Sequence, residues 1–125
     1  VRYESFETDD AEYLLVAYGV SSRICQKSVE VARAKGLKVG LLRPITLFPF
    51  PVKPIAEMAS RLKGVLSVEM SAGQMVEDVR LAVNGQTKVV HFGRLGGIIA
   101  SPDEVVKEIE HLFIEQKPVE QLVKA

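Results

Sequence analysis

Tyr13-Leu-Leu-Val-Ala-Tyr-Gly-Val-Ser-Ser22 is the stretch that decides the fold class. Its first six residues are nearly all apolar and end at a glycine, a pattern typical of a strand buried on both faces of a parallel sheet. Ser21 and Ser22 can cap a helix, which we expect to run to about Lys35 and to stop at Gly36. A buried strand followed directly by a helix is the repeating unit of an α/β domain.

The same unit recurs along the rest of the chain. The last helix has the clearest start, because Ser101 is a cap, Pro102 suits the first helical position and Glu104 completes a capping box. The alternation of polar and aromatic residues over 2–7 indicates an edge strand. Further strands are predicted at 39–42, 65–69 and 88–92, and further helices at 52–62, at 74–83 and from 101 onward. This order predicts a parallel sheet with helices on both faces.

Composition excludes several classes of function. Sixteen acidic residues balance sixteen basic residues, so the chain has no basic field for nucleic acid or for an anionic membrane surface. No segment approaches the roughly 20 apolar residues of a membrane span. Cys25 is the single cysteine, and His91 and His111 lie far apart in sequence, so we expect no disulfide, zinc site or iron–sulfur cluster. A lone thiol suits the reducing cytoplasm.

Four loops should meet at the carboxyl edge of the sheet, where parallel sheets bind ligands. None carries the glycine fingerprint of a dinucleotide fold or of a P-loop. The 93–97 loop combines glycines with Arg94 and could hold an anion, but a structural turn is the favoured interpretation. Backbone N–H groups over 71–74 could also bind an anion, yet Glu69 just before them would repel it, which favours structural capping. Catalysis by Glu69 is disfavoured, because no second acid or histidine is obvious nearby.

Other reactive side chains have structural interpretations. His91 lies inside a predicted strand, where a packed or hydrogen-bonded role is favoured over that of a base. Cys25 falls on the apolar side of its helix, which favours inert packing, although a helix start can activate a thiol. The oddest feature is Pro44-Ile-Thr-Leu-Phe-Pro-Phe-Pro51, a stiff apolar connection. If exposed, such a patch would indicate a surface that binds a partner.

Three stretches together resemble known enzymes. Val16-Ala-Tyr-Gly-Val-Ser-Ser22 and Leu42-Arg-Pro-Ile-Thr-Leu-Phe-Pro49 resemble the transketolase C-terminal domain, and they are shared with pyruvate and branched-chain dehydrogenases. Val68-Glu-Met-Ser-Ala-Gly-Gln-Met-Val-Glu-Asp-Val79, with Phe92-Gly-Arg-Leu-Gly-Gly97, is more specific. It is similar to the C-terminal part of the alpha subunit of 2-oxoacid:ferredoxin oxidoreductases, most of all the 2-oxoisovalerate (branched-chain) type. The resemblance spans roughly residues 13–112.

This resemblance implies a three-layer α/β/α fold with a five-stranded, mostly parallel sheet and an antiparallel edge strand near residues 2–7. It also implies a parent enzyme that decarboxylates a 2-oxoacid on thiamine diphosphate with magnesium, passes the acyl group to coenzyme A, and reduces ferredoxin through iron–sulfur clusters. Those cofactors are expected elsewhere in the complex and not in this chain. Residues 1–125 would be one domain of a longer chain, with a frayed tail over 115–125.

The expected role is assembly with other subunits or domains, without catalytic, cofactor-binding or metal-binding residues in this chain. A lipoamide-linked 2-oxoacid dehydrogenase and a stand-alone flavodoxin-like binding module remain alternatives. By loop position, the candidate contact residues are Arg43, Pro44, Thr46, Phe48, Pro49, Phe50, Ser71, Gly73 and Gln74, with Arg94, Gly96 and Gly97 as weaker candidates.

Overall fold

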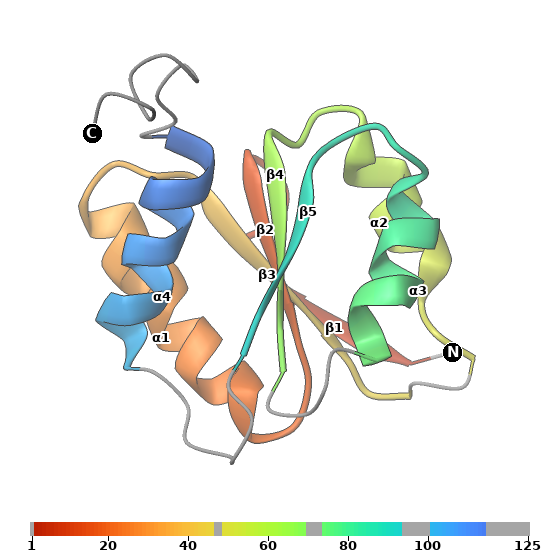
Figure 1. Ribbon diagram of the computed structural model, residues 1–125. Coiled ribbons are helices and arrows are strands. Elements are labelled where there is room, and N and C mark those ends of the chain that lie inside the picture. The colour runs from red at the N-terminus through yellow and green to blue at the C-terminus, as the bar shows by residue number, and fades with distance from the viewer. Residues whose placement is uncertain (1, 47–48, 70–73, 94–100, 115–125) are drawn as a thin grey trace.

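The computed structural model describes residues 2–46, 49–69, 74–93 and 101–114. Strands and helices alternate along nearly all of this part of the chain (Figure 1). The strands are β1 (Tyr3–Phe6), β2 (Tyr13–Ala17), β3 (Val39–Pro44), β4 (Gly64–Val68) and β5 (Val89–Phe92), and the helices are α1 (Val20–Ala34), α2 (Val52–Ala59), α3 (Gln74–Val83), α4 (Pro102–Ile109) and the π-helical turn η1 (Glu110–Ile114).

The five strands form one sheet in the order β1-β3-β2-β4-β5. β1 pairs antiparallel with β3, with Tyr3 opposite Pro44, whereas the other three pairings are parallel. The predicted antiparallel edge strand and parallel centre are therefore confirmed. Because β2, β3, β4 and β5 run in the same direction, the loops that follow them leave from one edge of the sheet.

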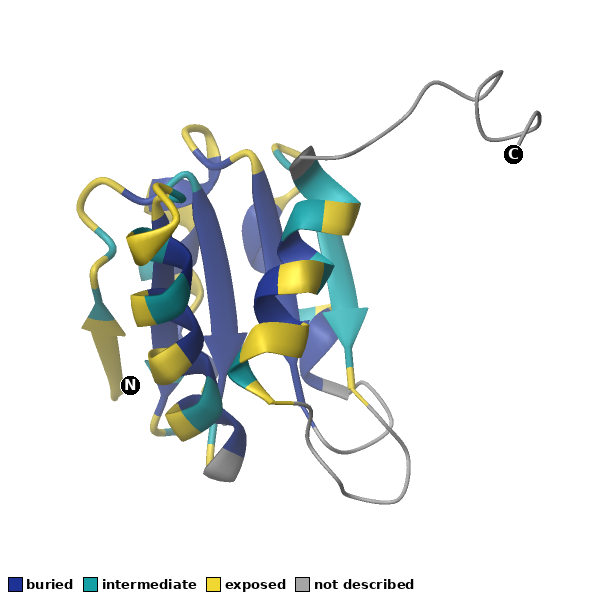
Figure 2. Ribbon diagram, turned by 90° about the vertical axis from the view of Figure 1, so that its left-hand side faces the viewer, coloured by how far each residue is buried: buried dark blue, intermediate teal, exposed yellow. Residues whose placement is uncertain are grey.

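Helices cover both faces of the sheet, as predicted (Figure 1). Alternate residues of β2 point to opposite faces: Leu14 and Val16 pack beneath α2 and α3, whereas Leu15 and Ala17 pack beneath α1 and α4. Both faces of β2 are buried (Figure 2), which explains its unbroken apolar run. Among the described residues, no helix is both long enough and apolar enough to cross a membrane.

The helix ends confirm some sequence predictions and correct others. Ser101 caps α4, since its hydroxyl accepts a hydrogen bond from the Glu104 N–H at 3.4 Å. The prediction that Ser21 or Ser22 caps α1 is wrong. The helix begins at Val20 after Gly19, which has a φ of 63°, and the Ser22 hydroxyl donates to the Gly19 carbonyl at 2.7 Å. Starting the helix one residue earlier places both serines inside its first turn.

The remaining difference from the sequence predictions lies in α2. α2 ends at Ala59 instead of Leu62, and Val52, predicted on its packed face, is 47% exposed. Val52 lines a surface groove, whereas Ile55, Met58 and Ala59 of the same helix are buried in the core. The predicted stops are confirmed, since Gly36 has a φ of 87° and Asn84 and Gly85 have φ of 53° and 77°.

Candidate functional site

The predicted contact loops leave from the carboxyl edge of the sheet, as expected. The 43–50 segment follows β3, and the 71–74 segment follows β4 and leads into α3. β2 lies between β3 and β4 in the sheet, so the two segments follow strands that are not adjacent. For Gln74 the structure describes the backbone alone. Six other contact candidates lie outside the described residues: Phe48, Ser71, Gly73, Arg94, Gly96 and Gly97.

Glu69 is the buried acid at this edge, with 2% of its surface exposed. Its carboxylate accepts hydrogen bonds from the Met75 N–H, at 3.0 Å to Oε2 and 3.3 Å to Oε1. Met75 is the second residue of α3, where free backbone N–H groups and the helix dipole favour a negative charge. This hydrogen bond gives Glu69 a structural role at the start of α3. Any anion binding at this helix start would compete with the protein's own carboxylate.

Gly93 fixes how closely β4 and β5 approach at their ends. The Glu69 N–H donates to the Phe92 carbonyl at 3.2 Å. A Cβ atom at Gly93 would overlap the backbone carbonyl oxygen of Glu69. Sequence reasoning treated Gly93 as part of a flexible loop and missed this requirement, because the contact joins residues that are distant in sequence.

Ser67 on β4 and His91 on β5 are register partners. Each lies two residues before one of the contact residues just described: Ser67 before Glu69, and His91 before Gly93. The Ser67 hydroxyl and the His91 Nδ1 atom are both buried, and neither has a hydrogen-bond partner among the residues that the structure describes. Of the packed or hydrogen-bonded roles that the sequence favours for His91, the buried Nδ1 agrees with packing. Ser67 and His91 are therefore not hydrogen-bonded to each other, and they do not form an acid–base pair that could transfer a proton.

The 43–46 segment is tied to the beginning of the chain. Thr46 Oγ1 accepts a hydrogen bond from the Arg2 N–H at 3.0 Å, and the Arg2 carbonyl accepts from the N–H groups of Ile45 at 2.9 Å and Thr46 at 3.1 Å. Arg43 pairs with Glu4 on β1, with 3.0 Å between Nη1 and Oε1. The half-exposed Arg43 pair contributes little to stability, but the backbone bonds hold Arg2 against the loop.

Packing separates the remaining contact candidates of this segment. Pro44 and Phe50 are buried, whereas Pro49 is exposed. Phe50 packs into the core beneath α2 and α3. Of these three residues, Pro49 is therefore the one whose ring is free to meet another molecule without rearrangement.

A groove of about 560 Å³ lies beside this segment, between β1 and the start of α2. Tyr3, Phe50, Pro51, Val52 and Pro54 form its apolar lining, and Lys53 and Glu57 are its charged residues. Sequence reasoning missed the contributions of Tyr3 and Val52. The alternating pattern of β1 gave no sign of a neighbouring groove, and Val52 sits at a position of the helical stripe that normally faces a core.

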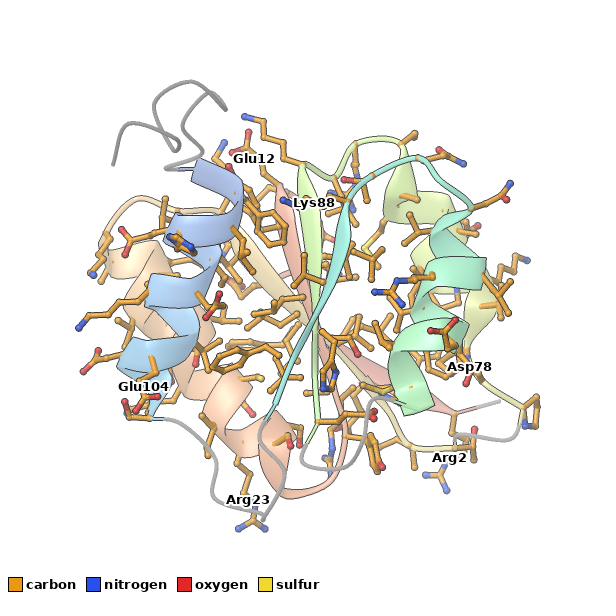
Figure 3. All side chains as sticks on the ribbon, viewed as in Figure 1. Arg2, Glu12, Arg23, Asp78, Lys88 and Glu104 are labelled. Carbon is orange, nitrogen blue, oxygen red and sulfur yellow. The ribbon has the colours of Figure 1, made fainter. Side chains whose placement is uncertain are left out.

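The polar side chains labelled at the carboxyl edge point outward. Figure 3 shows Arg2 and Arg23 projecting from this edge, away from the sheet. Within the described ranges, no three histidine, cysteine, aspartate or glutamate side chains gather to hold a metal ion. Cys25, on the inner face of α1, is fully buried against the sheet and α4, and burial raises the pKa of its thiol to about 12. This burial supports inert packing.

Comparison with protein families and curated proteins gives consistent matches. The pyruvate:ferredoxin oxidoreductase core domain II family matches residues 11–105. The ketoisovalerate oxidoreductase subunit VorB of Methanothermobacter thermautotrophicus is 50% identical over 112 residues, which cover 90% of this chain and 32% of that protein. The 2-oxoglutarate synthase subunit KorA of Methanothermobacter marburgensis is 36% identical over 102 residues, 82% of this chain and 27% of that protein.

Solved structures agree on the fold. A 2-oxoglutarate:ferredoxin oxidoreductase from Magnetococcus marinus superposes with a TM-score of 0.76 at 20% identity, covering 88% of this chain and 19% of that one. A split-gene transketolase superposes with a TM-score of 0.74 at 16% identity, covering 87% of this chain and 40% of that one. At such identities the likeness concerns the fold alone.

Proposed function

The chain belongs to the pyruvate:ferredoxin oxidoreductase core domain II family, and from this premise we propose that it is the C-terminal domain of the alpha subunit of a 2-oxoisovalerate:ferredoxin oxidoreductase. The observation that carries the proposal is the 50% identity to a ketoisovalerate oxidoreductase subunit over 90% of the chain. Identity to the 2-oxoglutarate subunit from Methanothermobacter marburgensis is lower, at 36%. This difference supports the branched-chain substrate.

The chain spans about a third of the length of the curated relatives it matches. We propose that residues 1–125 form one domain of a longer subunit. The parent enzyme would oxidatively decarboxylate the 2-oxoacid, form the acyl-coenzyme A and reduce ferredoxin, in the cytoplasm. This domain would hold other parts of the complex in place around an active site that lies outside it.

The side chains of this domain do not fit the cofactors of such an enzyme. An iron–sulfur cluster needs several cysteine thiolates, whereas the single cysteine is buried with a thiol pKa raised to about 12. Among the described residues, no three histidine, cysteine, aspartate or glutamate side chains form a cluster. We therefore assign thiamine diphosphate, magnesium and the clusters to other parts of the complex, and we derive no chemical step within this domain.

An assembly role agrees with what the carboxyl edge offers. Its buried acid is occupied by the backbone of α3, and its exposed apolar surface lies over Pro49 and the adjoining groove. The contact residues predicted from loop position remain our candidates, with the 43–50 and 71–74 segments ahead of 94–97. The lipoamide-linked dehydrogenase and the stand-alone flavodoxin-like module receive no support from the family match.

Substrate oxidation by the intact parent complex tests this proposal. The complex is purified anaerobically, supplied with thiamine diphosphate and coenzyme A, and given 2-oxoisovalerate, pyruvate or 2-oxoglutarate, while reduction of ferredoxin is followed. We expect the fastest reduction with 2-oxoisovalerate and none from the 125-residue chain alone. A preference for another acid would overturn the branched-chain assignment, and activity of the chain alone would overturn the assembly role.

A further inference from the structure

Exposed apolar side chains are concentrated beside the start of α2. The structure describes four large apolar side chains that are strongly exposed: Tyr3 at 43%, Ile45 at 40%, Val52 at 47% and Leu81 at 76%. Two of the four, Tyr3 and Val52, line the same groove together with Phe50, Pro51 and Pro54. A contiguous apolar patch with polar residues at its border is the usual mark of a protein-binding surface.

The charges of the groove favour a protein over a small ligand. Small-molecule sites combine an apolar lining with a few rigidly placed polar groups. Here the side chains of Lys53 and Glu57 are the charged groups, and they lie one helical turn apart on exposed positions of α2. Neither forms an ion pair within the described part of the chain. Long charged side chains around an apolar centre are the arrangement of a protein interface with its polar rim.

The beginning of the chain lies at the edge of this groove. The Arg2 carbonyl accepts from the N–H groups of Ile45 and Thr46, the Arg2 N–H donates to Thr46 Oγ1, and Tyr3 itself lines the groove. Figure 1 shows the N-terminal end of β1 beside the segment that leads into α2. Polypeptide joined to Arg2 would therefore reach the groove across a short span, which gives it a high effective concentration there.

We propose that this groove binds the part of the parent subunit that precedes Arg2. This inference rests on the proposed function, in which this chain is the C-terminal domain of a longer subunit; the matched residues make up 32% of the VorB relative. The bound region would insert an apolar side chain between Tyr3 and Val52. It would also place an acidic group near Lys53 and a basic group near Glu57.

Thiol labelling at position 52 tests the inference directly. Val52→Cys introduces a thiol at a half-exposed position, and Leu81→Cys is the matched control on α3, outside the groove. The native Cys25 is buried and does not compete. Each variant is made in the 125-residue chain, in the full parent subunit and in the assembled complex. A maleimide is added, and the labelling rate is read peptide by peptide with mass spectrometry.

We expect the thiol at position 52 to react about tenfold or more slowly in the full subunit than in the 125-residue chain, because the centre of an interface excludes solvent. The thiol at position 81 should react at the same rate in both. Equal rates at position 52 would overturn the inference, as would equal slowing at both positions. Slowing that appears only in the assembled complex would assign the groove to another subunit, and slowing in the 125-residue chain at high concentration would assign it to a second copy.

Ferredoxin reduction by the same complex separates this inference from the proposed function. An active complex with position 52 freely labelled would keep the function and overturn the docking. Protection of position 52 in a complex that oxidises none of the three 2-oxoacids would keep the docking and overturn the function.

Discussion

The carboxylate of Glu69 binds the backbone N–H of Met75, with 3.0 Å between Oε2 and the nitrogen. The two residues bracket the 70–74 segment, which joins the end of β4 to the start of α3. A buried carboxylate at this point satisfies a free helix N–H and fixes the distance between the two ends of the segment. The two ends of the segment predicted to contact other subunits are therefore joined by the side chain of Glu69, which is 2% exposed.

Loss of the Glu69 cap should weaken the domain. We expect Glu69→Ala to lower the free energy of unfolding by about 2 kcal/mol, because a buried helix N–H loses its acceptor. Glu69→Gln should cost about half as much, since the amide oxygen still accepts but lacks the charge that the helix dipole favours. Urea unfolding of the 125-residue chain followed by circular dichroism measures both. An alanine variant as stable as the wild type would show that the bond contributes nothing.

Gly93 should tolerate no side chain. Gly93→Ala is expected to lower the free energy of unfolding by about 2 kcal/mol, because its Cβ would overlap the Glu69 carbonyl and push β4 and β5 apart. Gly85→Ala is the control, since Gly85 has a φ of 77° but open space around it. This substitution should lower the free energy of unfolding by about 1 kcal/mol, which is half the loss expected for Gly93→Ala. Urea unfolding compares them, and the reverse order of the two costs would contradict the steric argument.

The contact between Gly93 and Glu69 shows which features of the fold the sequence does not predict. The strands, the sheet direction and most helix stops were predictable, because apolar runs, capping residues and glycines act locally. The carboxyl edge as the site of the contact loops followed from the parallel sheet. The Gly93–Glu69 contact, the exposure of Val52 and the groove beside Tyr3 could not be predicted, since each depends on residues that are distant in sequence and meet only in the folded chain.

The ion pair between Asp10 and Arg33 should make stability depend on acid. Arg33 Nη2 lies 2.7 Å from Asp10 Oδ1, and this hydrogen bond lowers the pKa of Asp10 below its ordinary 3.8. A lowered folded pKa means that the contribution is present above 3.8 and is lost as the pH falls through the folded value. We expect wild type to be more stable than Asp10→Asn at neutral pH and the difference to shrink below about pH 4.

Asp9→Asn is the matched control for this pH dependence, because the neighbouring Asp9 forms no ion pair within the described residues. Both variants are measured beside wild type by thermal unfolding in buffers of equal ionic strength. A stability difference for Asp10→Asn that does not change with pH would contradict the assignment to the carboxylate.

Cys25 should react only when the chain unfolds. Burial raises the pKa of its thiol to about 12, so at pH 8 the reactive thiolate is scarce as well as inaccessible. We expect the rate of modification by iodoacetamide to rise with urea in parallel with the unfolded fraction. Mass spectrometry of quenched samples gives the rate. Rapid modification without denaturant would show that the packing around α1 opens locally.

Ser67→Ala should stabilise the domain, which is unusual for a substitution in a core. The Ser67 hydroxyl is fully buried and has no hydrogen-bond partner in the described part of the chain, so folding desolvates it without compensation. We expect its removal to raise the free energy of unfolding by about 1 kcal/mol. The substitution takes no hydrogen bond from His91 Nδ1, because none joins this atom to Ser67.

The control for Ser67→Ala is Ser28→Ala, at an equally buried serine whose hydroxyl donates to the Ile24 carbonyl at 2.8 Å. This substitution leaves a carbonyl without its second donor, and we expect it to leave stability unchanged or to lower it by up to about 1 kcal/mol. Urea unfolding of the two variants beside wild type should give shifts of opposite sign or a gain for Ser67→Ala alone. A loss of stability in Ser67→Ala would mean that its hydroxyl is hydrogen-bonded in solution, and a gain in both variants would mean that burial of the hydroxyl, and not its missing partner, sets the cost.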